Sequence, residues 1–587
     1  MVEVFLMASS SKKTKHFSDL AQKHALPFVH LDSQTCHPYL LKLEHRYDYS
    51  QLQALPIALS TTLTVATTNP SQANKKNIIE FFTKKYGKKI NLVVTTSDDF
   101  NMVLADNFKE EDTYTIANIR DVVDEYHSAS HTFSPLAKLF LSVLVAFIVY
   151  GAATHFFLTA LWVNLFLSSG TLILMAYKLG LTLYSMRYLF QRPPEKPPKL
   201  LAVYPIYTVL IPLLFEEKNT LTLLVEALSR LDYPQDKLDV KFLMEAHDLK
   251  TLSILKQMDL PWTYQLLIVP AGEPRSKPRA CNYGVRFALG EYLTIYDAED
   301  RPDPDQLKVA LQVMRNSEPE VGCVQASLNF YNFRENIITR LFTIEYTYWY
   351  DCLVPALSSL SVLVPLGGTS NHFKTVVLRE IGGWDPYLGT EDAEIGVRLG
   401  RHGYIVKHIN STTYEEANTR LWNWFKQRSR WNKGYMQTYL LNMRDPINLL
   451  KQLGFWKFIN FQFFVGGNVF FQLANLPLWL FLGSSIFFYH SLTDLFPNTL
   501  LALCWYNFLI SNTVLLICQF AATYHRRLYG LLPFVPLKIL YWLLMSFAGY
   551  YAVYELLVRP GYWYKTQHNL SKQGRKTDVP LDDKNKK

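Results

Sequence analysis

The sequence YLTIYDAED, residues 292–300, joins an apolar run to three carboxylates that lie within four residues. The apolar run is typical of a buried strand, and the acidic residues begin where that strand ends. Like charges this close repel, so the cluster is stable only if it is protonated or bridged by a cation. Divalent ions such as Mg²⁺ or Mn²⁺ bind carboxylate oxygens and keep positions for phosphate. A solvated acidic turn, which Pro302 and Pro304 favour, is the alternative.

Strand-like and helical segments alternate on both sides of this stretch. The strand-like runs are Tyr207–Leu213, Val240–Glu245, Tyr264–Val269, Tyr292–Asp297 and Val321–Gln325, and the helical runs are 219–230, 250–258, 279–289 and 304–315. This alternation predicts an α/β domain with a parallel sheet covered by helices on both faces. Ligands of such sheets bind beyond the carboxyl ends of the strands, where Asp297 is expected.

Two other parts of the chain are apolar enough to cross a membrane, which takes about 20 residues per helix. Residues 136–184 fit two helices, and three further stretches follow residue 450, at about 456–489, 499–523 and 533–557. The first of the three is interrupted at Asn475-Leu476-Pro477, so five or six spans are expected. Lys and Arg residues lie beside the apolar stretches, which predicts a multi-pass protein of the inner membrane whose soluble domain between the two apolar parts is cytosolic.

Composition excludes some classes of protein. The 587 residues carry a formal charge of only +9, and no basic, aromatic-studded soluble face is evident, so nucleic acid is not an expected partner. The six cysteines show no metal-ligand spacing and are expected to be buried thiols. The first residues lack the basic and apolar regions of a signal peptide, so the first domain is expected to stay cytosolic.

A second acidic motif, Thr390-Glu391-Asp392, is predicted to open a helix, with Thr390 as its N-cap. The two carboxylates suit the positive end of the helix dipole, which is one interpretation of them. Two glycine-rich loops, 367–371 and 382–385, come just before this motif. They favour the other interpretation, in which the backbone packs tightly around a ligand.

A third motif, Gln427-Arg428-Ser429-Arg430-Trp431, lies on another predicted helix. Gln427, Arg430, Trp431 and Gly434 are spaced at i, i+3, i+4 and i+7, so they share one face. The guanidinium of Arg430 can grip a diphosphate, the indole offers a flat surface to a sugar ring, and the glycine leaves space beside them. A helix lying on the membrane surface is the alternative, and the two interpretations are compatible.

These three motifs in this order resemble the processive family 2 glycosyltransferases, a group that includes enzymes of the cellulose synthase and hyaluronan synthase type. The resemblance covers about residues 200–560. It implies a GT-A (Rossmann-like) catalytic fold, inversion at the anomeric carbon and a divalent metal, Mg²⁺ or Mn²⁺. It also implies a growing polymer that passes through a channel formed by the membrane helices.

The resemblance also assigns roles to the acidic residues. Asp297 would bind the metal and diphosphate. The family usually reads Asp-x-Asp here, so the second metal contact would come from Glu299 or Asp300. Asp392 would be the general base that deprotonates the acceptor hydroxyl, and Glu391 would lie beside it in the acceptor site.

Five side chains from three segments would bind the nucleotide sugar: Glu245, Asp248, Lys277, Gln427 and Arg430. The last two would hold the diphosphate, and Lys277 belongs to a segment resembling the one that precedes the family's metal strand. The first two stand where the family usually has an Asp-Asp-Gly type turn, which is a departure from its pattern. Trp431 would stack under the acceptor sugar.

The first part of the chain resembles the N-terminal domain of type II secretion and pilus assembly ATPases. The match rests on LPFVHLD, residues 26–32, and LTVATTNP, residues 63–70. Some of those domains bind cyclic di-GMP, but the Arg-Leu-Gly signature of the nucleotide-binding versions is missing here. A regulatory or docking role is therefore the expectation, and cyclic di-GMP is a candidate ligand without a motif to support it.

The predicted domain order follows from these patterns: 1–112, a small α/β regulatory or docking domain; 113–135, a linker; 136–184, two transmembrane helices; 200–450, the GT-A domain; 451–560, interfacial and transmembrane helices; 561–587, a basic cytosolic tail. The resemblance implies a hexosyltransferase that uses a nucleotide sugar, such as a UDP-sugar, to elongate and export a bacterial exopolysaccharide, with or without an export partner protein. The alternatives are a non-processive transferase acting on a lipid and a non-catalytic secretion subunit.

Overall fold

A computed structural model describes residues 11–32, 36, 38–124, 128–129, 132–191, 198, 200–487, 496 and 498–561. The chain forms two compact units. The first contains residues 1–123, 200–298 and 373–386, and the second contains residues 124–199, 299–372 and 387–587. All but the first residue of the predicted basic tail, 561–587, lies outside the described residues.

The N-terminal part of the first unit is a small α/β domain, as predicted. Its three-stranded sheet has the order β1-β2-β3, with β1 and β2 antiparallel and β2 and β3 parallel. Its elements are α1 (Ser11–Lys23), α2 (Arg46–Leu52), β1 (Ala54–Leu59), β2 (Thr62–Thr67), α3 (Gln72–Tyr86), β3 (Lys89–Val94), α4 (Ser97–Asn107) and α5 (Lys109–Asp124). Helix α5 runs through the predicted boundary at residue 112.

Two strand assignments in this domain differ from expectation. The apolar pattern of residues 26–31, in the LPFVHLD segment, predicts a strand, but this segment makes only a single bridge, between Phe28 and Val94. Strand β1 was not anticipated, since its sequence ALPIAL contains Pro56, which cannot donate a ladder hydrogen bond and usually argues against a strand.

The rest of the first unit contains four parallel strands in the order β6-β5-β4-β7. They are β4 (Tyr207–Leu213), β5 (Leu238–Glu245), β6 (Tyr264–Val269) and β7 (Tyr292–Ile295). The helices are α8 (Lys218–Ser229), α9 (Leu249–Gln257), α10 (Lys277–Arg286) and α14 (Thr375–Glu380). The predicted alternation is confirmed here, and the almost continuous apolar strands are typical of a parallel sheet that is covered on both faces.

The soluble part of the second unit has a mixed sheet. Strand β9 (Val321–Phe330) is parallel to β11 (Ile405–Glu415), whereas β8 (Arg301–Pro302) is antiparallel to β11, so the expected purely parallel sheet is wrong at this edge. The short β10 (Asn371–Lys374) contains the boundary between the units. The helices are α11 (Gln306–Asn316), α12 (Ile337–Tyr348), α13 (Val354–Ser359), α15 (Glu391–Arg401) and α16 (Leu421–Asn442), with a π-helical turn, η7 (Trp349–Leu353), between α12 and α13.

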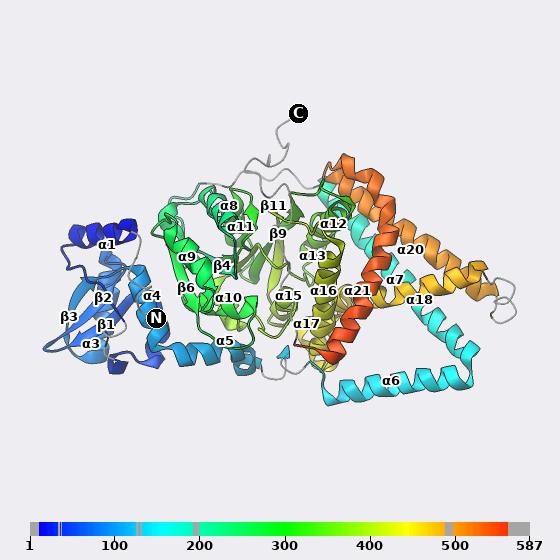
Figure 1. The fold of residues 1–587 in the computed structure, drawn as a ribbon, viewed down its shortest axis with the longest axis horizontal. Coiled ribbons are helices and arrows are strands. Elements are labelled where there is room, and N and C mark those ends of the chain that lie inside the picture. Colours follow the sequence, from blue (N-terminus) through cyan, green and yellow to red (C-terminus); the bar gives the residue numbers. More distant parts are fainter. Residues whose placement is uncertain are drawn as a thin grey trace. The chain divides into compact units, whose positions relative to one another are not determined.

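Long apolar helices make up the remainder of the second unit (Figure 1). They are α6 (Pro135–Thr154), α7 (Phe156–Gln191), α17 (Pro446–Phe461), α18 (Gly467–Phe487), α20 (Asn498–His525) and α21 (Lys538–Val558), with a π-helical turn, η8 (Gln462–Gly466), before α18 and a 3-10 segment, η9 (Tyr529–Leu537), before α21. Within the described residues, five helical stretches are long and apolar enough to cross a membrane: 137–154, 156–188, 446–487, 498–525 and 529–558.

The predicted interruption at Asn475-Leu476-Pro477 is wrong, because α18 continues through Pro477. A proline leaves the carbonyl four residues earlier without its helical N–H partner. Here that carbonyl belongs to Leu473, and the hydroxyl of Tyr550 donates a hydrogen bond to it at 2.7 Å. The chain instead breaks at Gly454, in α17, whose φ of 72° lies in the left-handed region that favours glycine.

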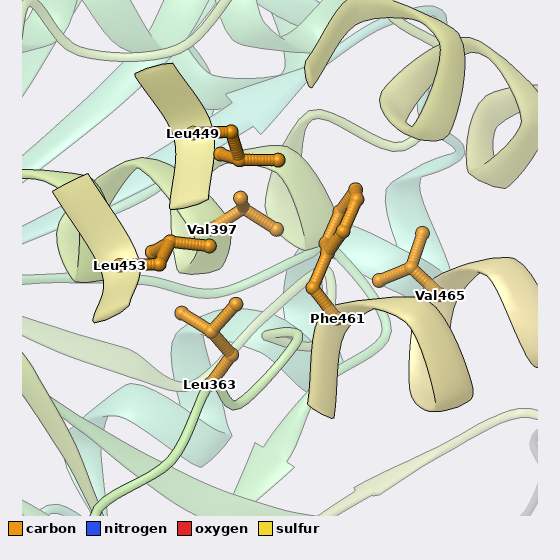
Figure 2. Close-up of a cluster of buried hydrophobic side chains, with 6 residues drawn as sticks. All are labelled: Leu363, Val397, Leu449, Leu453, Phe461 and Val465. Carbon is orange, nitrogen blue, oxygen red and sulfur yellow. The ribbon is translucent and has the colours of Figure 1, made fainter. Parts of the chain in front are cut away.

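One hydrophobic cluster joins the acidic helix α15 to the first of the late apolar helices (Figure 2). Val397 of α15 packs in it against residues of α17, of the π-helical turn η8 and of the loop after α13. Its buried members are Leu363, Val397, Leu449, Leu453, Phe461 and Val465. The cluster therefore fixes the helix that begins with the Thr-Glu-Asp motif against the membrane-proximal part of the second unit.

Candidate active site

Asp297 lies just beyond the carboxyl end of β7, as the sequence predicts. The ammonium Nζ of Lys277, the first residue of α10, lies 2.6 Å from its Oδ1, and both side chains are partly exposed, by 22% and 32%. Two residues assigned to the metal and to the donor are thus brought together in the first unit. The lysine supplies positive charge to a carboxylate where a divalent ion and a diphosphate would meet.

The other donor-site candidates of the first unit make contacts within the fold. The carboxylate of Glu245, at the end of β5, pairs with the fully buried guanidinium of Arg279 at 3.4 Å. Burial raises the pKa of Glu245, although Arg279 opposes that shift. Asp248 caps α9 by accepting from the backbone N–H of Thr251 at 3.0 Å, and it also accepts from the N–H of Phe215. The sequence did not single out Arg279 within the lysine-containing segment.

The two alternatives for the second metal contact differ in their surroundings. Asp300 is buried, and its carboxylate accepts a hydrogen bond from the hydroxyl of Thr369, whereas Glu299 is partly exposed. Among the residues that the structure describes, no three His, Cys, Asp or Glu side chains come together in a way that could hold a metal ion.

In the second unit, α15 begins at Glu391, so the Thr-Glu-Asp motif opens a helix as predicted. Glu391 and Asp392 are both partly exposed in the first turn, where the helix dipole favours carboxylates. The Oδ1 of Asp392 accepts from the N–H of Ala393 at 2.9 Å. Burial, together with the nearby Asp392 carboxylate, raises the pKa of Tyr435 on α16 well above its usual range.

The Thr-Glu-Asp motif and the Gln-x-x-Arg-Trp helix α16 pack directly against each other. A Cβ on Gly434 of α16 would lie 2.3 Å from Oγ1 and 2.7 Å from the backbone N of Thr390. One turn away, a Cβ on Gly389 would lie 3.6 Å from the carbonyl oxygen of Arg430, which is ordinary contact. The space that the sequence assigned to Gly434 is thus filled by the residue that begins the acidic motif.

The remaining residues of the α16 motif are held by neighbouring side chains. The Oε1 of Gln427 accepts a hydrogen bond from Nδ2 of Asn418 at 2.7 Å. The indole of Trp431 stacks near the ring of Tyr346, with centroids 6.3 Å apart, and meets the ring of Phe342 edge-on at 6.0 Å. Gln427, Arg430 and Trp431 all remain partly exposed, so ligand contact is open to each of them.

The pattern of strands, acidic motifs and apolar helices is matched by models of known protein families. Residues 292–554 match the model described as glycosyl transferase family group 2, and residues 208–359 match glycosyl transferase family 2. Residues 208–554, which the two models cover together, therefore belong to the family 2 glycosyltransferases. Residues 24–113 match the MshEN domain, in line with the resemblance of the N-terminal part to secretion ATPases. The family 2 domain has the GT-A-like fold that the resemblance implied, with a mixed sheet in place of the expected parallel one.

Relatives of this family 2 chain include plant proteins. One is the probable glucomannan 4-beta-mannosyltransferase 15 of Arabidopsis thaliana, which is 27% identical over 324 residues, covering 50% of this chain and 59% of that protein. Another is the probable glucomannan 4-beta-mannosyltransferase 11 of the same plant, 23% identical over 304 residues, covering 47% of this chain and 68% of that protein. The chain thus spans 59% of the length of the first relative.

Among solved structures, the mannosyltransferase PcManGT from Pyrobaculum calidifontis in complex with GDP-Man and Mn²⁺ superposes with a TM-score of 0.43 and 19% identity, covering 67% of this chain and 99% of that one. The glucosyl-3-phosphoglycerate synthase from Mycobacterium tuberculosis in complex with Mn²⁺ and UDP-glucose gives a TM-score of 0.28 and 17% identity, covering 43% of this chain and 79% of that one.

A buried charge cluster beside the family motif was not anticipated from the sequence. Glu345 of α12 accepts from Arg428 of α16 at 2.9 Å and from the hydroxyl of Tyr541 of α21 at 2.6 Å, and the ammonium of Lys538 lies 3.6 Å away. Figure 1 shows α16 and α21 side by side in the second unit. The four residues come from three segments that are far apart in the sequence, so no local pattern could have revealed the cluster.

Arg428 also lies between aromatic rings, 4.2 Å from the centroid of Phe342 and 4.7 Å from that of Trp431. Burial alone would raise the pKa of Glu345, but Arg428, Lys538 and Tyr541 outweigh it and hold that pKa below its ordinary value. The cluster therefore ties the motif helix α16 to α12 and to the last apolar helix.

Substitution of Gly434 by alanine tests the packing of the two motifs. Alanine favours a helix, so Gly434→Ala should not weaken α16 itself, but its Cβ would push Thr390 and Asp392 away. We expect sugar transfer to fall by about 10²-fold, as misplacement of reacting groups by about 1 Å does. Gly483→Ala on α18, where nothing lies within 4 Å, is the control. Equal transfer rates in the two variants would contradict the packing argument.

Substitution of Glu345 by glutamine tests the charge cluster. Loss of the carboxylate leaves two buried cations unpaired, which we expect to destabilise the protein by about 3–5 kcal/mol at pH 7. Glu217→Gln removes a carboxylate from an exposed pair with Lys250, and such pairs contribute about 0–1 kcal/mol. Thermal unfolding in detergent measures both variants.

The difference in stability between wild type and Glu345→Gln depends on pH. The pKa of Glu345 in the folded protein lies below its ordinary value of 4.5, so its contribution to stability is present above pH 4.5 and is lost as the pH falls below that value. The gap in unfolding temperature between wild type and Glu345→Gln should therefore narrow in acid. A gap that is absent at pH 7, or that widens in acid, would contradict this account.

Proposed function

We propose that this chain is an inverting, metal-dependent glycosyltransferase that uses a nucleotide sugar to elongate a polysaccharide at a membrane. The contact between Gly434 and Thr390 carries the proposal, because it sets the carboxylate of Asp392 beside the helix that bears Arg430 and Trp431. A general base, a cation for a diphosphate and a flat aromatic surface for a sugar are the groups that such a transfer needs.

The proposed reaction is a single displacement. Asp392 accepts the proton of the acceptor hydroxyl, whose oxygen forms a bond to the anomeric carbon of the donor as the bond from that carbon to the diphosphate breaks. The nucleoside diphosphate leaves with the electron pair of the broken bond. Arg430 and Lys277 stabilise the negative charge that develops on it, and such preorganised charges usually supply much of the rate enhancement.

The residues at the end of β7 fit a divalent ion. Asp297 is partly exposed and already accommodates a positive charge, that of Lys277, and Glu299 is the more accessible of the two other carboxylates. We therefore assign Asp297 and Glu299 to the ion, and Asp300 to the hydrogen bond with Thr369. When bound, Mg²⁺ or Mn²⁺ would neutralise charge on the diphosphate.

Relatives guide the choice of donor. The plant relatives are named as mannosyltransferases of glucomannan, which supports a hexosyl donor and places GDP-mannose beside the UDP-sugars in the first screen. We propose that Glu245, at the carboxyl end of β5, and Arg279, which pairs with it, contact the nucleoside part, because ligands of such sheets bind at that end of the strands.

Polar residues within the apolar helices support passage of the product across the membrane. A cavity among α7, α18 and α20 is lined by Thr171, Asn475, Asn507, Ser511 and Asn512, together with Trp479. Amide side chains are costly in a bilayer and usually face a pathway or a partner there. We therefore propose a multi-pass protein of the inner membrane, with its catalytic domain in the cytosol and the glycan leaving between these helices.

Substitution of Asp392 by asparagine tests the general base. Without a proton acceptor, we expect transfer to the glycan to fall by about 10²–10⁴-fold. The purified protein in nanodiscs is supplied with GDP-mannose and a set of UDP-sugars, and release of nucleoside diphosphate is measured. Asp445→Asn, at the N-cap of α17, is the matched acidic control, because asparagine caps a helix about as well as aspartate does. Wild-type transfer by Asp392→Asn would rule out this residue as the base.

Chelation tests the metal. We expect EDTA to abolish transfer and added Mn²⁺ or Mg²⁺ to restore it, because the carboxylates of Asp297 and Glu299 repel a diphosphate unless a cation lies between them. Glu299→Gln should raise the Mn²⁺ concentration needed for half-maximal activity by about tenfold. Asp300→Asn, measured on the fraction of protein that folds, should raise this concentration less. Activity that EDTA leaves unchanged would remove the ion from the proposal.

A further inference from the structure

The N-terminal domain is bonded to the catalytic part of the first unit through buried polar groups. The ammonium of Lys13 donates to the backbone carbonyl of Tyr264 at 2.6 Å, and Nδ2 of Asn101 donates to Oε1 of Gln265 at 2.8 Å. Both acceptors lie on β6, the edge strand in the order β6-β5-β4-β7. The domain therefore covers a sheet edge that would otherwise be open to other strands.

A second set of contacts reaches α10. The carboxylate of Asp112, on α5, is fully buried and pairs with two arginines, at 3.2 Å with Arg46 of the same domain and at 2.7 Å with Arg286. Arg46 also stacks over the ring of Phe287, 4.5 Å from its centroid, just after α10 ends. Asp112 thus joins the N-terminal domain to the last residue of α10 by charge.

Helix α10 connects this carboxylate to the candidate donor site. Arg286 is its last residue and Lys277, paired with Asp297, is its first. The residues from Pro278 to Val285 are all buried, so the helix can shift only as a rigid rod about 15 Å long. Gly284 packs so closely on the sheet that a Cβ there would lie 2.9 Å from side-chain atoms of Leu210 and Leu243.

Helix α5 also comes close to the first turn of α10. A Cβ on Gly272 would lie 2.8 Å from Nη2 of Arg279 and 3.1 Å from Cγ2 of Thr113. Thr113 follows Asp112, so the loop at residue 272 is enclosed between the N-terminal domain and the guanidinium that pairs with Glu245. Adjacent residues of α5 therefore lie near both ends of α10. Thr113 is near the first turn, which carries Lys277 and Arg279, and Asp112 pairs with Arg286, the last residue.

We propose that the N-terminal domain is a positioning element of the transferase, in which Asp112 holds α10 through Arg286 and so sets the affinity for the nucleoside diphosphate of the donor. This inference rests on the proposed function, because it needs Lys277 and Arg279 to contact the donor. Asp112 and Arg286 touch no substrate in this scheme and act only through the position of α10.

The test compares variants of Arg286, which is 24% exposed and so tolerates change better than the fully buried Asp112. Full-length Arg286→Gln, Arg286→Lys and Asp112→Asn are purified in nanodiscs, and binding of Mn²⁺–GDP and Mn²⁺–UDP is measured by calorimetry. Asp98→Asn is the matched control, since Asp98 pairs with Lys13 at 3.1 Å in the same domain without touching α10.

We expect Arg286→Gln and Asp112→Asn to raise the Kd of the bound diphosphate, and the donor KM, by about tenfold, while kcat at saturating donor changes by less than about twofold. Arg286→Lys keeps the cation and should rescue binding, and Asp98→Asn should bind as wild type. A merely structural role would instead lower the active fraction, and with it kcat, at unchanged KM.

The inference is overturned if wild type binds a nucleoside diphosphate and Arg286→Gln, still folded by its unfolding temperature, binds it equally well. It is also overturned if Asp98→Asn weakens binding as much as Asp112→Asn does. Failure of wild type to bind either diphosphate with Mn²⁺ would overturn the proposed function itself, before any variant is compared, and this inference with it.

Discussion

The approach of two backbones at Gly434 and Thr390 is the constraint on which the rest of the second unit depends. Only a residue without a side chain allows α16 to lie this close to the start of α15, since a Cβ at 434 would overlap Thr390. Around this contact, the apolar cluster of Val397 ties α15 to α17. Glu345 then ties α16 to α12 and α21 by charge. The polar site and the apolar helices are thus built as one structure.

In the first unit, ion pairs hold the side chains of the candidate donor site in place. Lys277 and Arg279 project from one buried helix toward Asp297 and Glu245, and each cation is paired before any ligand arrives. Paired charges of this kind are preorganised, so a phosphate group can replace a carboxylate partner with little rearrangement. The N-terminal MshEN domain adds one more pair at Asp112, which makes it part of this framework rather than a separate module.

Sequence reasoning succeeded where one local pattern carried the information. The strands from Tyr207 to Val269, the strand-end position of Asp297 and the helix start at Thr390 all follow from periodicity and caps. It failed where the tertiary structure decides. The helix continues through Pro477 because the hydroxyl of Tyr550 donates a hydrogen bond to the carbonyl of Leu473. The sequence around Pro477 does not distinguish it from a proline that ends a helix. Likewise, the partners of Asp112 and Glu345 lie 66 to 196 residues away, and no local pattern could supply them.

The size of the product tests the central claim most directly. Purified wild-type protein in nanodiscs would be incubated with Mn²⁺ and radiolabelled GDP-mannose or UDP-hexose, and the labelled product would be sized by gel electrophoresis and mass spectrometry. If the chain is a polymerising family 2 transferase, the product is a ladder of glycans that are built of the labelled hexose and lengthen with time. A product that carries one sugar on a lipid, or no release of nucleoside diphosphate from any donor, would contradict the account.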